Sequence, residues 1–288
     1  MKPIIIFVAG LPRSGSTLLM NLLAQNPRHH VTPTNGLINL MTMVRDNWAQ
    51  VESFQSQGLE QVQPRVAASL RAMTYGFYER ELASGRVVFD KSRGWLQHIE
   101  LLEEVYQRPV RVICPVRDLR AVAASFEKLH RANPMGRRGY LGPAYVAAQT
   151  IDGRARVVLS PGGVAGLPVN AIRDAMSRGV SDRVVVVRYQ ELVSKPQESL
   201  DNLHELLGLP GFKYDPDHVK QVTVEDDLLL GWGPDLHTIR PRVEPPVEAP
   251  WRGVLPESTV SWINQDFSDI QGLVYSSPQG ETPDSGAE

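Results

Sequence analysis

The residues with the clearest chemical meaning lie in one stretch near the N-terminus, PIIIFVAGLPRSGSTLL. Gly10, Gly15 and Thr17 have the spacing of a nucleotide phosphate loop, G-x-x-x-x-G-K-[ST], but Ser16 stands where that motif has lysine. The loop amides and the following helix start can still bind an anion. The lysine that reaches the outer phosphates of a triphosphate is missing, and Arg13 offers a cation at the loop apex instead. The stretch therefore predicts a site for one phosphate with a transferable group, rather than for a triphosphate with magnesium.

This loop resembles the 5′-phosphosulfate loop of the sulfotransferases that use 3′-phosphoadenosine 5′-phosphosulfate (PAPS). In that family a Lys or Arg follows a proline and is itself followed by Ser-Gly-Thr/Ser-Thr. The residues that match this pattern one by one are Arg13, Ser14, Gly15, Ser16 and Thr17. The resemblance implies that these residues bind the 5′-phosphosulfate and that Arg13 helps to neutralise the charge of the transferring group.

A second stretch, VRVICPVRDLRAVAASF, resembles the family's 3′-phosphate element, in which an Arg ends a strand and a Ser follows eight residues later. Arg117 and Ser125 have that spacing. Asp118 can cap the helix that follows. Arg117 would then lie at the carboxyl end of a strand, where open α/β sheets bind ligands, and its planar guanidinium suits a terminal phosphate. The resemblance implies that Arg117 and Ser125 bind the 3′-phosphate.

Two weaker matches complete the expected cofactor site. VVVVRYQELVSKP resembles a strand of the family followed by R-Y-E-x-L-x-x-x-P, with Gln190 in place of the Glu, and implies that Tyr189 lines the nucleotide pocket as in the tyrosylprotein branch. LHTIRPRV resembles the C-terminal segment that closes over the cofactor in that branch and in some bacterial or phage-type enzymes. Arg240 is the matching cation on the 3′-phosphate side, and Arg242 is an alternative.

Lys91, in VVFDKSRGW, follows the second apolar run. In the family a lysine just beyond that strand contacts the transferring sulfuryl group, and the resemblance gives Lys91 this catalytic role beside Arg13. Transfer also needs a general base for the acceptor. Arg93 stands where the cytosolic branch has a histidine, and counting from the loop toward the glutamate of the tyrosylprotein branch arrives at Thr34 and Asn35, which are not strong bases. The remaining candidates are His237, His130, His98, Asp90 and Asp46; His237 is the best placed, in the closing segment.

The apolar pattern predicts an α/β fold of the P-loop type, a doubly wound, mostly parallel sheet with helices on both faces. Four β-branched runs at 4–8, 87–89, 110–116 and 183–187 are expected strands. Helical spacing is found at 16–25, 36–54, 60–84, 95–106, 118–131, 170–177 and 197–207, and His29 and His30 are expected to mark the end of the first helix.

No linker divides the chain, so one domain is expected over 1–275. Two segments rich in turn-forming residues, about 132–168 and 231–253, are expected to form irregular lids or substrate-binding loops. The polar tail 276–288 is expected to be disordered. The first apolar run is too short for a signal peptide, and no stretch approaches the ~20 apolar residues of a membrane span.

Composition narrows the function further. The formal charge is −2 and the pI is about 6.4, which argues against a general nucleic-acid or membrane-surface binder. The single cysteine, Cys114, lies in an apolar run and is expected to be a buried thiol, as in a reducing cytoplasm. The sequence has neither H-E-x-x-H nor C-x-x-C, so no metal site is expected.

The sequence therefore predicts a cytoplasmic, metal-independent enzyme that transfers a sulfuryl group from PAPS to an acceptor hydroxyl or amine and releases 3′-phosphoadenosine 5′-phosphate (PAP). A small molecule, a glycan or a peptide is left open as the acceptor, and so is a homodimer. Two alternatives remain: a P-loop nucleotide or small-molecule kinase, and a catalytically inactive module that binds PAP or PAPS.

Overall fold

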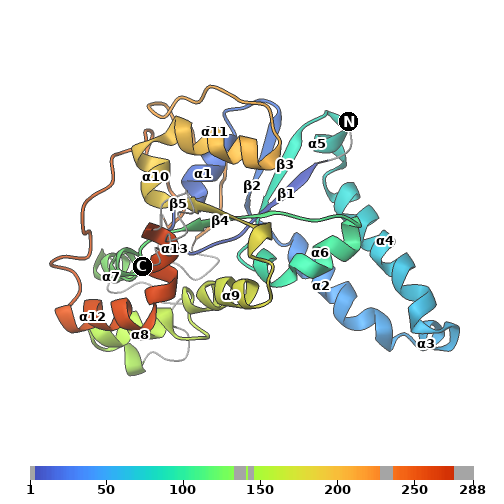
Figure 1. Cartoon of the computed structure of the whole chain (residues 1–288), viewed down its shortest axis with the longest axis horizontal. Helices are drawn as coiled ribbons and strands as arrows, with labels where there is room; N and C mark the ends of the chain where they lie inside the picture. Colours follow the sequence, from blue (N-terminus) through green and yellow to red (C-terminus); the bar gives the residue numbers. More distant parts are fainter. Residues whose placement is uncertain (1–3, 133–140, 142–145, 228–235, 276–288) are drawn as a thin grey trace, which may run out of the picture.

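The computed structural model describes residues 4–132, 141, 146–227 and 236–275. Its centre is a sheet of five parallel strands in the order β2-β3-β1-β4-β5 (Figure 1). The strands are β1 (Ile5–Val8), β2 (His29–Thr34), β3 (Val87–Lys91), β4 (Val112–Val116) and β5 (Val184–Arg188). Every residue of β1 and β4 is buried, as expected for central strands of a sheet that is covered on both faces.

Helices cover the two faces of the sheet, and alternate residues of β1 point to opposite sides. Ile6 and Val8 face one core with α1 (Ser16–Leu23) and α11 (Pro196–Leu207), next to which α10 (Tyr189–Ser194) lies. Ile5 and Phe7 face the larger core. Its helices are α2 (Leu37–Asn47), α4 (Leu59–Phe77), α6 (Ile99–Tyr106), α7 (Leu119–Ala132), α8 (Ile151–Leu159), α9 (Gly166–Ser177), α12 (Glu257–Asp266) and α13 (Ser268–Tyr275). The predicted fold class is confirmed.

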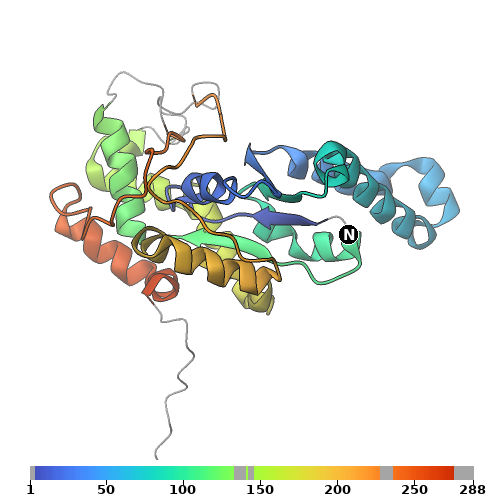
Figure 2. The ribbon, with the colours of Figure 1, turned by 90° about the horizontal axis from the view of Figure 1, so that it is seen from above.

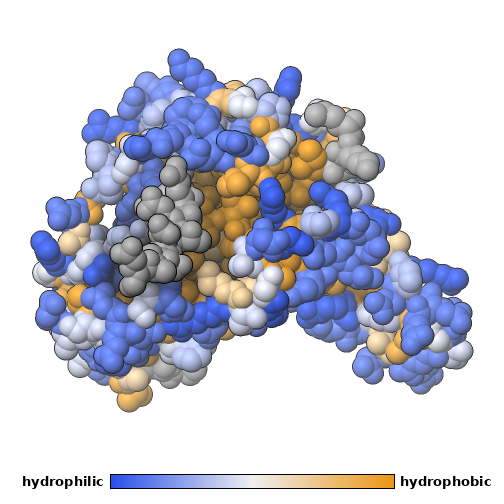
Figure 3. Space-filling view, in the orientation of Figure 1, coloured by the Kyte–Doolittle hydropathy of each residue, from blue (hydrophilic) through white to orange (hydrophobic). Residues whose placement is uncertain are grey.

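An arm built from α2, α3 (Glu52–Gln57) and α4 extends from the sheet at the side opposite to α12 and α13 (Figures 1 and 2). A short helix, α5 (Glu79–Ala83), follows α4. The arm is largely hydrophilic on the face seen in Figure 3, with isolated hydrophobic side chains. The two long helices predicted here, 36–54 and 60–84, are each divided in two, because a turn at Trp48–Gln50 separates α2 from α3 in the first and Tyr78 separates α4 from α5 in the second.

The prediction that His29 and His30 end the first helix is wrong. Helix α1 ends at Leu23, and His29 opens β2, an edge strand that pairs with β3. Pro33 is tolerated in β2 because an edge strand has one row of unpaired amides, and the register between β2 and β3 shifts at this point. Burial lowers the pKa of His29 to about 4, so His29 packs as a neutral core residue.

The segments predicted to be irregular are only partly so. The region 132–168 contains all of α8 and the start of α9, and residues 133–140 and 142–145 lie outside the described residues. From 236 to 253 the chain forms neither helix nor strand and crosses over the loop that follows β1. The tail 276–288 lies outside the described residues. No helix of the described chain is long and apolar enough to cross a membrane.

Candidate functional site

The loop after β1 has the backbone of an anion-binding turn. Gly10 and Gly15 have φ of 104° and 82°, values at which a side chain would be strained. A Cβ at Gly15 would also lie 2.7 Å from Cδ2 of Tyr189, and one at Gly10 would lie 2.5 Å from the Pro115 carbonyl oxygen. Helix α1 begins directly after Gly15, so its first amides face the loop.

The position of this loop in the sheet suits ligand binding. The chain leaves β1 toward α1 on one face of the sheet and leaves the neighbouring strand β4 toward α7 on the other face. In open α/β sheets ligands bind at such a switch point, outside the carboxyl ends of the strands. The predicted 5′-phosphate loop and the predicted 3′-phosphate element therefore lie at adjacent strand ends.

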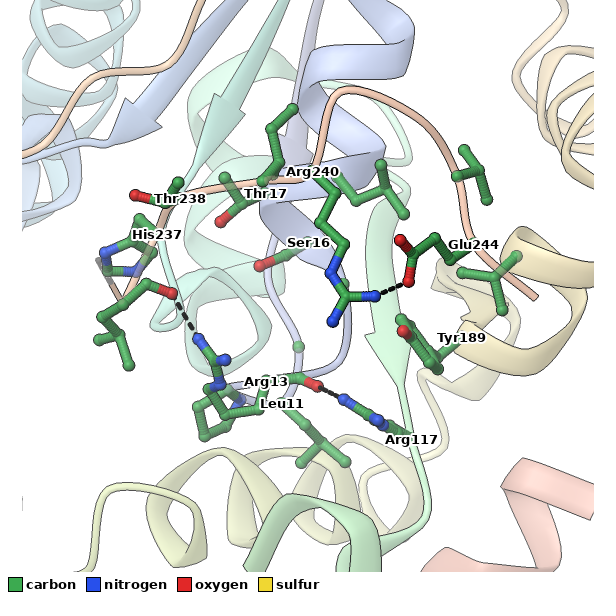
Figure 4. A pocket seen from close by; sticks show the side chains of 18 of the residues that line it. Leu11, Arg13, Ser16, Thr17, Arg117, Tyr189, His237, Thr238, Arg240 and Glu244 are labelled. Atoms are coloured by element: carbon green, nitrogen blue, oxygen red, sulfur yellow. Dashed lines mark hydrogen bonds and ion pairs between the residues drawn. The ribbon is translucent and has the colours of Figure 1, made fainter. Parts of the chain in front are cut away.

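Arg13 and Arg117 meet beside this loop (Figure 4), and Ser125 contacts Arg13. Arg13 has a φ of 60°, uncommon for a residue with a side chain, and its Nε donates a 2.9 Å hydrogen bond to Ser125 Oγ. Arg117 donates to the Arg13 carbonyl oxygen at 2.8 Å, and its guanidinium lies 4.1 Å from the centre of the Tyr189 ring. The predicted loop arginine thus contacts the predicted 3′-phosphate serine.

These two guanidiniums are electrostatically costly without an anion. Burial, followed by the nearby Arg117 charge, lowers the pKa of Arg13, and burial also lowers the pKa of Arg117. The Nε of Arg117 is buried and finds no hydrogen-bond partner among the described residues. A buried donor without a partner is rare in proteins. The Nε of Arg117 is therefore suited to donate a hydrogen bond to an anionic ligand.

These residues open onto a cavity of about 370 Å³. Most predicted site residues line it, whereas Ser14 is buried with its hydroxyl bonded to the Leu11 carbonyl, and Ser125 stands behind Arg13. Its cationic lining residues are Arg13, Lys91, Arg93, Arg117, Lys128, Arg240 and Arg242. Among the described lining residues Glu244 is the one acid, and it forms an ion pair with Arg240. The cavity is therefore suited to a highly anionic ligand.

Lys91 is the last residue of β3, rather than the first residue beyond it, and its side chain also lines this cavity. Its Nζ lies 2.9 Å from Glu225 Oε1, and both side chains are almost fully buried. Burial lowers the pKa of Lys91, and the Glu225 charge opposes that shift. Glu225 also accepts the backbone amide of Thr34 at 2.8 Å. The Glu225 carboxylate thus lies beside Thr34, one of the two positions that correspond by count to the glutamate of the tyrosylprotein branch.

His237 forms a hydrogen-bonded pair with Asp227. Its Nδ1 lies 2.5 Å from Asp227 Oδ1, and its backbone amide donates to Asp227 Oδ2 at 3.0 Å. With the Nδ1 proton donated to Asp227, Nε2 is left as the acceptor nitrogen of the ring. Glu225 Oε2 lies 3.6 Å from the same Nδ1. The pairing has the geometry of a histidine base oriented by a carboxylate.

Glu225 and Asp227 were not predicted, and they reach the site on a segment that we call the strap, residues 219–227. Asn21 of α1 holds it: its Nδ2 donates to Thr223 Oγ1 at 2.7 Å, and its Oδ1 accepts the Val222 amide at 2.5 Å. Asn21 is fully buried. No local sequence motif predicts these contacts. The sole signal in the sequence is an isolated asparagine, Asn21, inside an apolar helix.

The other base candidates lie elsewhere. His98 contacts Arg45 at 3.0 Å, Asp46 is an exposed partner of the same arginine, and His130 lies near the end of α7. None of these, nor Asp90, is among the described residues that line the cavity. No group of three potential metal ligands occurs in the described ranges.

Asp90 belongs instead to a buried hydrogen-bonded cluster below Lys91. Its carboxylate accepts hydrogen bonds from Asn35 Nδ2 at 2.7 Å, from Trp95 Nε1 at 2.8 Å and from the Tyr78 hydroxyl. Burial raises the pKa of Asp90, although these three donors oppose the shift. The cluster joins β3 to the base of the arm.

Asp90→Ala is expected to lower the free energy of unfolding by about 3–5 kcal/mol, because it leaves three buried donors without their acceptor. Urea denaturation followed by circular dichroism measures this loss. Asp182→Ala, at an exposed aspartate, is the matched control and is expected to change stability by less than about 0.5 kcal/mol. A comparable small loss in the Asp90 variant would show that the cluster contributes little.

Comparisons with known proteins agree with this geometry. Residues 3–214 match the model of a family described as the sulfotransferase family. The nodulation protein NoeE of Sinorhizobium fredii is 27% identical over 243 residues, or 79% of this chain; the chain spans about half (54%) of that relative.

Two solved structures share the fold. The sulfotransferase domain of the Synechococcus PCC 7002 olefin synthase has a TM-score of 0.52 at 22% identity and covers 96% of each chain. The sulfotransferase domain from the curacin biosynthetic pathway has a TM-score of 0.52 at 19% identity, over 92% of this chain and 98% of that one. With nearly three quarters of its length matched by the family model and the phosphate loop within that match, the chain belongs to the sulfotransferase family.

Proposed function

We propose that the protein transfers the sulfuryl group of PAPS to an acceptor hydroxyl or amine and releases PAP. The observation that carries this proposal is the pair of partly buried arginines, Arg13 and Arg117, that meet beside a phosphate loop with serine in the lysine position. A donor with a phosphate at each end of an adenosine requires one cationic group near each phosphate. A nucleoside triphosphate would instead require the missing loop lysine.

In this proposal the amides of Gly15, Ser16 and Thr17 hold the 5′-phosphosulfate at the start of α1. Arg117 and Ser125 hold the 3′-phosphate, for which the partnerless Nε of Arg117 is a ready donor. The hydrogen bond between Arg13 and Ser125 supports a second role for Arg13, in which its guanidinium serves the 3′-phosphate while its backbone shapes the loop.

Tyr189 and Arg240 complete the proposed donor site. Tyr189 supports Arg117 through its ring. Arg240 lies on the segment that crosses the loop (Figure 4), and its ion pair with Glu244 would exchange for a contact with the 3′-phosphate side.

In sulfuryl transfer the bond between sulfur and the 5′-phosphate oxygen breaks, a bond from sulfur to the acceptor oxygen or nitrogen forms, and the acceptor loses a proton. Arg13, Lys91 and the loop amides stabilise the charge on the sulfuryl oxygens and on the leaving oxygen. His237 accepts the proton at Nε2, while Asp227 fixes its orientation through Nδ1. The acceptor in this proposal is a small molecule, a glycan or a peptide.

PAP and PAPS are expected to raise the melting temperature by about 5 °C or more at a hundredfold excess over Kd, because such binding adds about 2.7 kcal/mol. ATP and GTP with magnesium are expected to have little effect, since Ser16 replaces the loop lysine. Differential scanning fluorimetry makes this comparison. Stabilisation by ATP-Mg and not by PAP would overturn the proposal in favour of a kinase. Transfer of ³⁵S-sulfate from PAPS to pooled acceptors then separates an enzyme from an inactive binding module.

A further inference from the structure

The ion pair between Lys91 and Glu225 is unusual for its burial. The two side chains are 7% and 5% exposed, and Nζ lies 2.9 Å from Oε1. A lysine removed from water tends to lose its proton unless a fixed negative charge stands beside it. The role proposed for Lys91 requires its positive charge, because a neutral amine would stabilise the anionic sulfuryl oxygens far less. Some neighbouring group therefore has to keep Lys91 charged.

The charged groups that face Lys91 identify that neighbour. Arg93 acts on Lys91 in the wrong direction, since its charge lowers the pKa of Lys91 as burial does. Glu225 and the more distant Asp227 oppose this lowering, and Glu225 also accepts a hydrogen bond from Lys91 Nζ, which fixes the position of the ammonium. Asp227 is already hydrogen-bonded to His237. Burial disfavours the charged form of Glu225, but Lys91 and the Thr34 amide lower its pKa overall, so Glu225 is an anion.

We propose that Glu225 is a positioning residue for sulfuryl transfer, which holds the Lys91 ammonium charged and turned toward the cavity; this rests on the proposed function. Glu225 Oε1 accepts a hydrogen bond from one of the three N–H groups of Lys91 Nζ, and the Thr34 amide holds that oxygen in place. The other two N–H groups stay available to donate to a ligand. Lys91 lines the cavity, whereas Glu225 is not among the described residues that do so. Glu225 therefore acts through Lys91.

The strap explains why this residue has no counterpart in the motifs. Glu225 lies beyond the stretch that matches the family model, residues 3–214, and 134 positions from Lys91. It reaches Lys91 because Asn21 binds the strap through Thr223 and Val222. The second oxygen of Glu225 is buried, has no hydrogen-bond partner in the described ranges, and lies 3.6 Å from His237 Nδ1. One carboxylate thus stands between the two side chains proposed for the chemistry.

The test is Glu225→Gln, which keeps the shape and a hydrogen-bond acceptor but removes the charge. We expect kcat for transfer from PAPS to fall about tenfold or more at pH 8. Because the variant's Lys91 loses its proton at lower pH than the wild type's, the ratio of variant to wild-type kcat is expected to rise as the pH falls to 6. The affinity for PAP, which has no sulfuryl group, is expected to stay unchanged by calorimetry. Asp226→Asn, at the exposed neighbour on the strap, is the matched control.

A ratio that stays constant from pH 6 to 8 would overturn the proposal, since a purely structural defect has no reason to follow the protonation of Lys91. So would wild-type kcat at every pH.

A second measurement is independent of turnover. Acetic anhydride acylates an amine only in its neutral form. The acetylation rate of Lys91 against pH, followed by peptide mass spectrometry, therefore gives its titration midpoint in the donor-free protein. Glu225→Gln is expected to move this midpoint to lower pH, and an unmoved midpoint would overturn the proposal. If Glu225→Gln moves the midpoint but the wild-type protein transfers no sulfate, the Glu225–Lys91 coupling stands and the proposed function is refuted instead.

Discussion

Lys91→Met is expected to lower kcat for sulfuryl transfer by about 10²- to 10³-fold, the usual cost of removing one group that stabilises transition-state charge. The change removes the cation that is proposed to face the sulfuryl oxygens and keeps a side chain of similar length. PAP affinity, measured by calorimetry, is expected to stay within about twofold, because PAP lacks the sulfuryl group that Lys91 is proposed to contact. A loss of kcat with retained PAP affinity assigns Lys91 to the transfer step rather than to donor binding.

Stability has to be separated from catalysis in this variant. Lys91→Met alone leaves Glu225 buried without its partner, at an expected cost of about 3–5 kcal/mol. The double variant Lys91→Met/Glu225→Gln removes both charges and is expected to recover most of that stability while remaining inactive. Lys195→Ala, at an exposed lysine paired with Glu198, is the control for loss of a lysine. Wild-type turnover by the double variant would exclude a catalytic role for Lys91.

The features that the sequence predicted correctly are those set by neighbouring residues. Apolar runs of β-branched residues predicted four of the five strands; central strands such as β1 and β4 are buried on both faces and so favour unbroken apolar runs. Edge strand β2 was not predicted, because HHVTPT contains one apolar residue and a proline. Its pairing with β3, rather than its own composition, makes it a strand. Helix α8 was not predicted either, because turn-forming residues flank it on both sides.

The candidate site divides in the same way. The phosphate loop, Arg117 and Lys91 were predicted from local motifs and from the family resemblance that those motifs carry. The structure brings them together because each stands at a strand end, and parallel strands bring their ends to one edge. Glu225 and Asp227 were not, because the strap is neither helix nor strand and reaches the site through contacts with Asn21, about 200 positions away. The prediction for His237 gave its segment but not its orienting partner, Asp227.

Arg117→Ala is expected to weaken PAP binding about 100-fold, because charge-assisted hydrogen bonds to a buried phosphate contribute about 1.5–3 kcal/mol each. Arg117→Lys keeps the charge but not the planar guanidinium, so its PAP affinity is expected to lie between those of Arg117→Ala and the wild type. Isothermal calorimetry at fixed salt measures both. Arg86→Ala, at a partly exposed arginine with a loose ion pair to Glu81, is the matched control.

Arg117 also binds the Arg13 carbonyl and packs on Tyr189, so its removal alters the loop as well as the proposed phosphate contact. AMP, which lacks the 3′-phosphate, distinguishes the two effects. If Arg117 binds that phosphate, the Arg117→Ala variant binds AMP almost as the wild type does and loses only the extra affinity of PAP over AMP. If AMP and PAP weaken by the same factor, Arg117 supports the loop and does not contact the 3′-phosphate. Unchanged affinity for both would remove Arg117 from the donor site altogether.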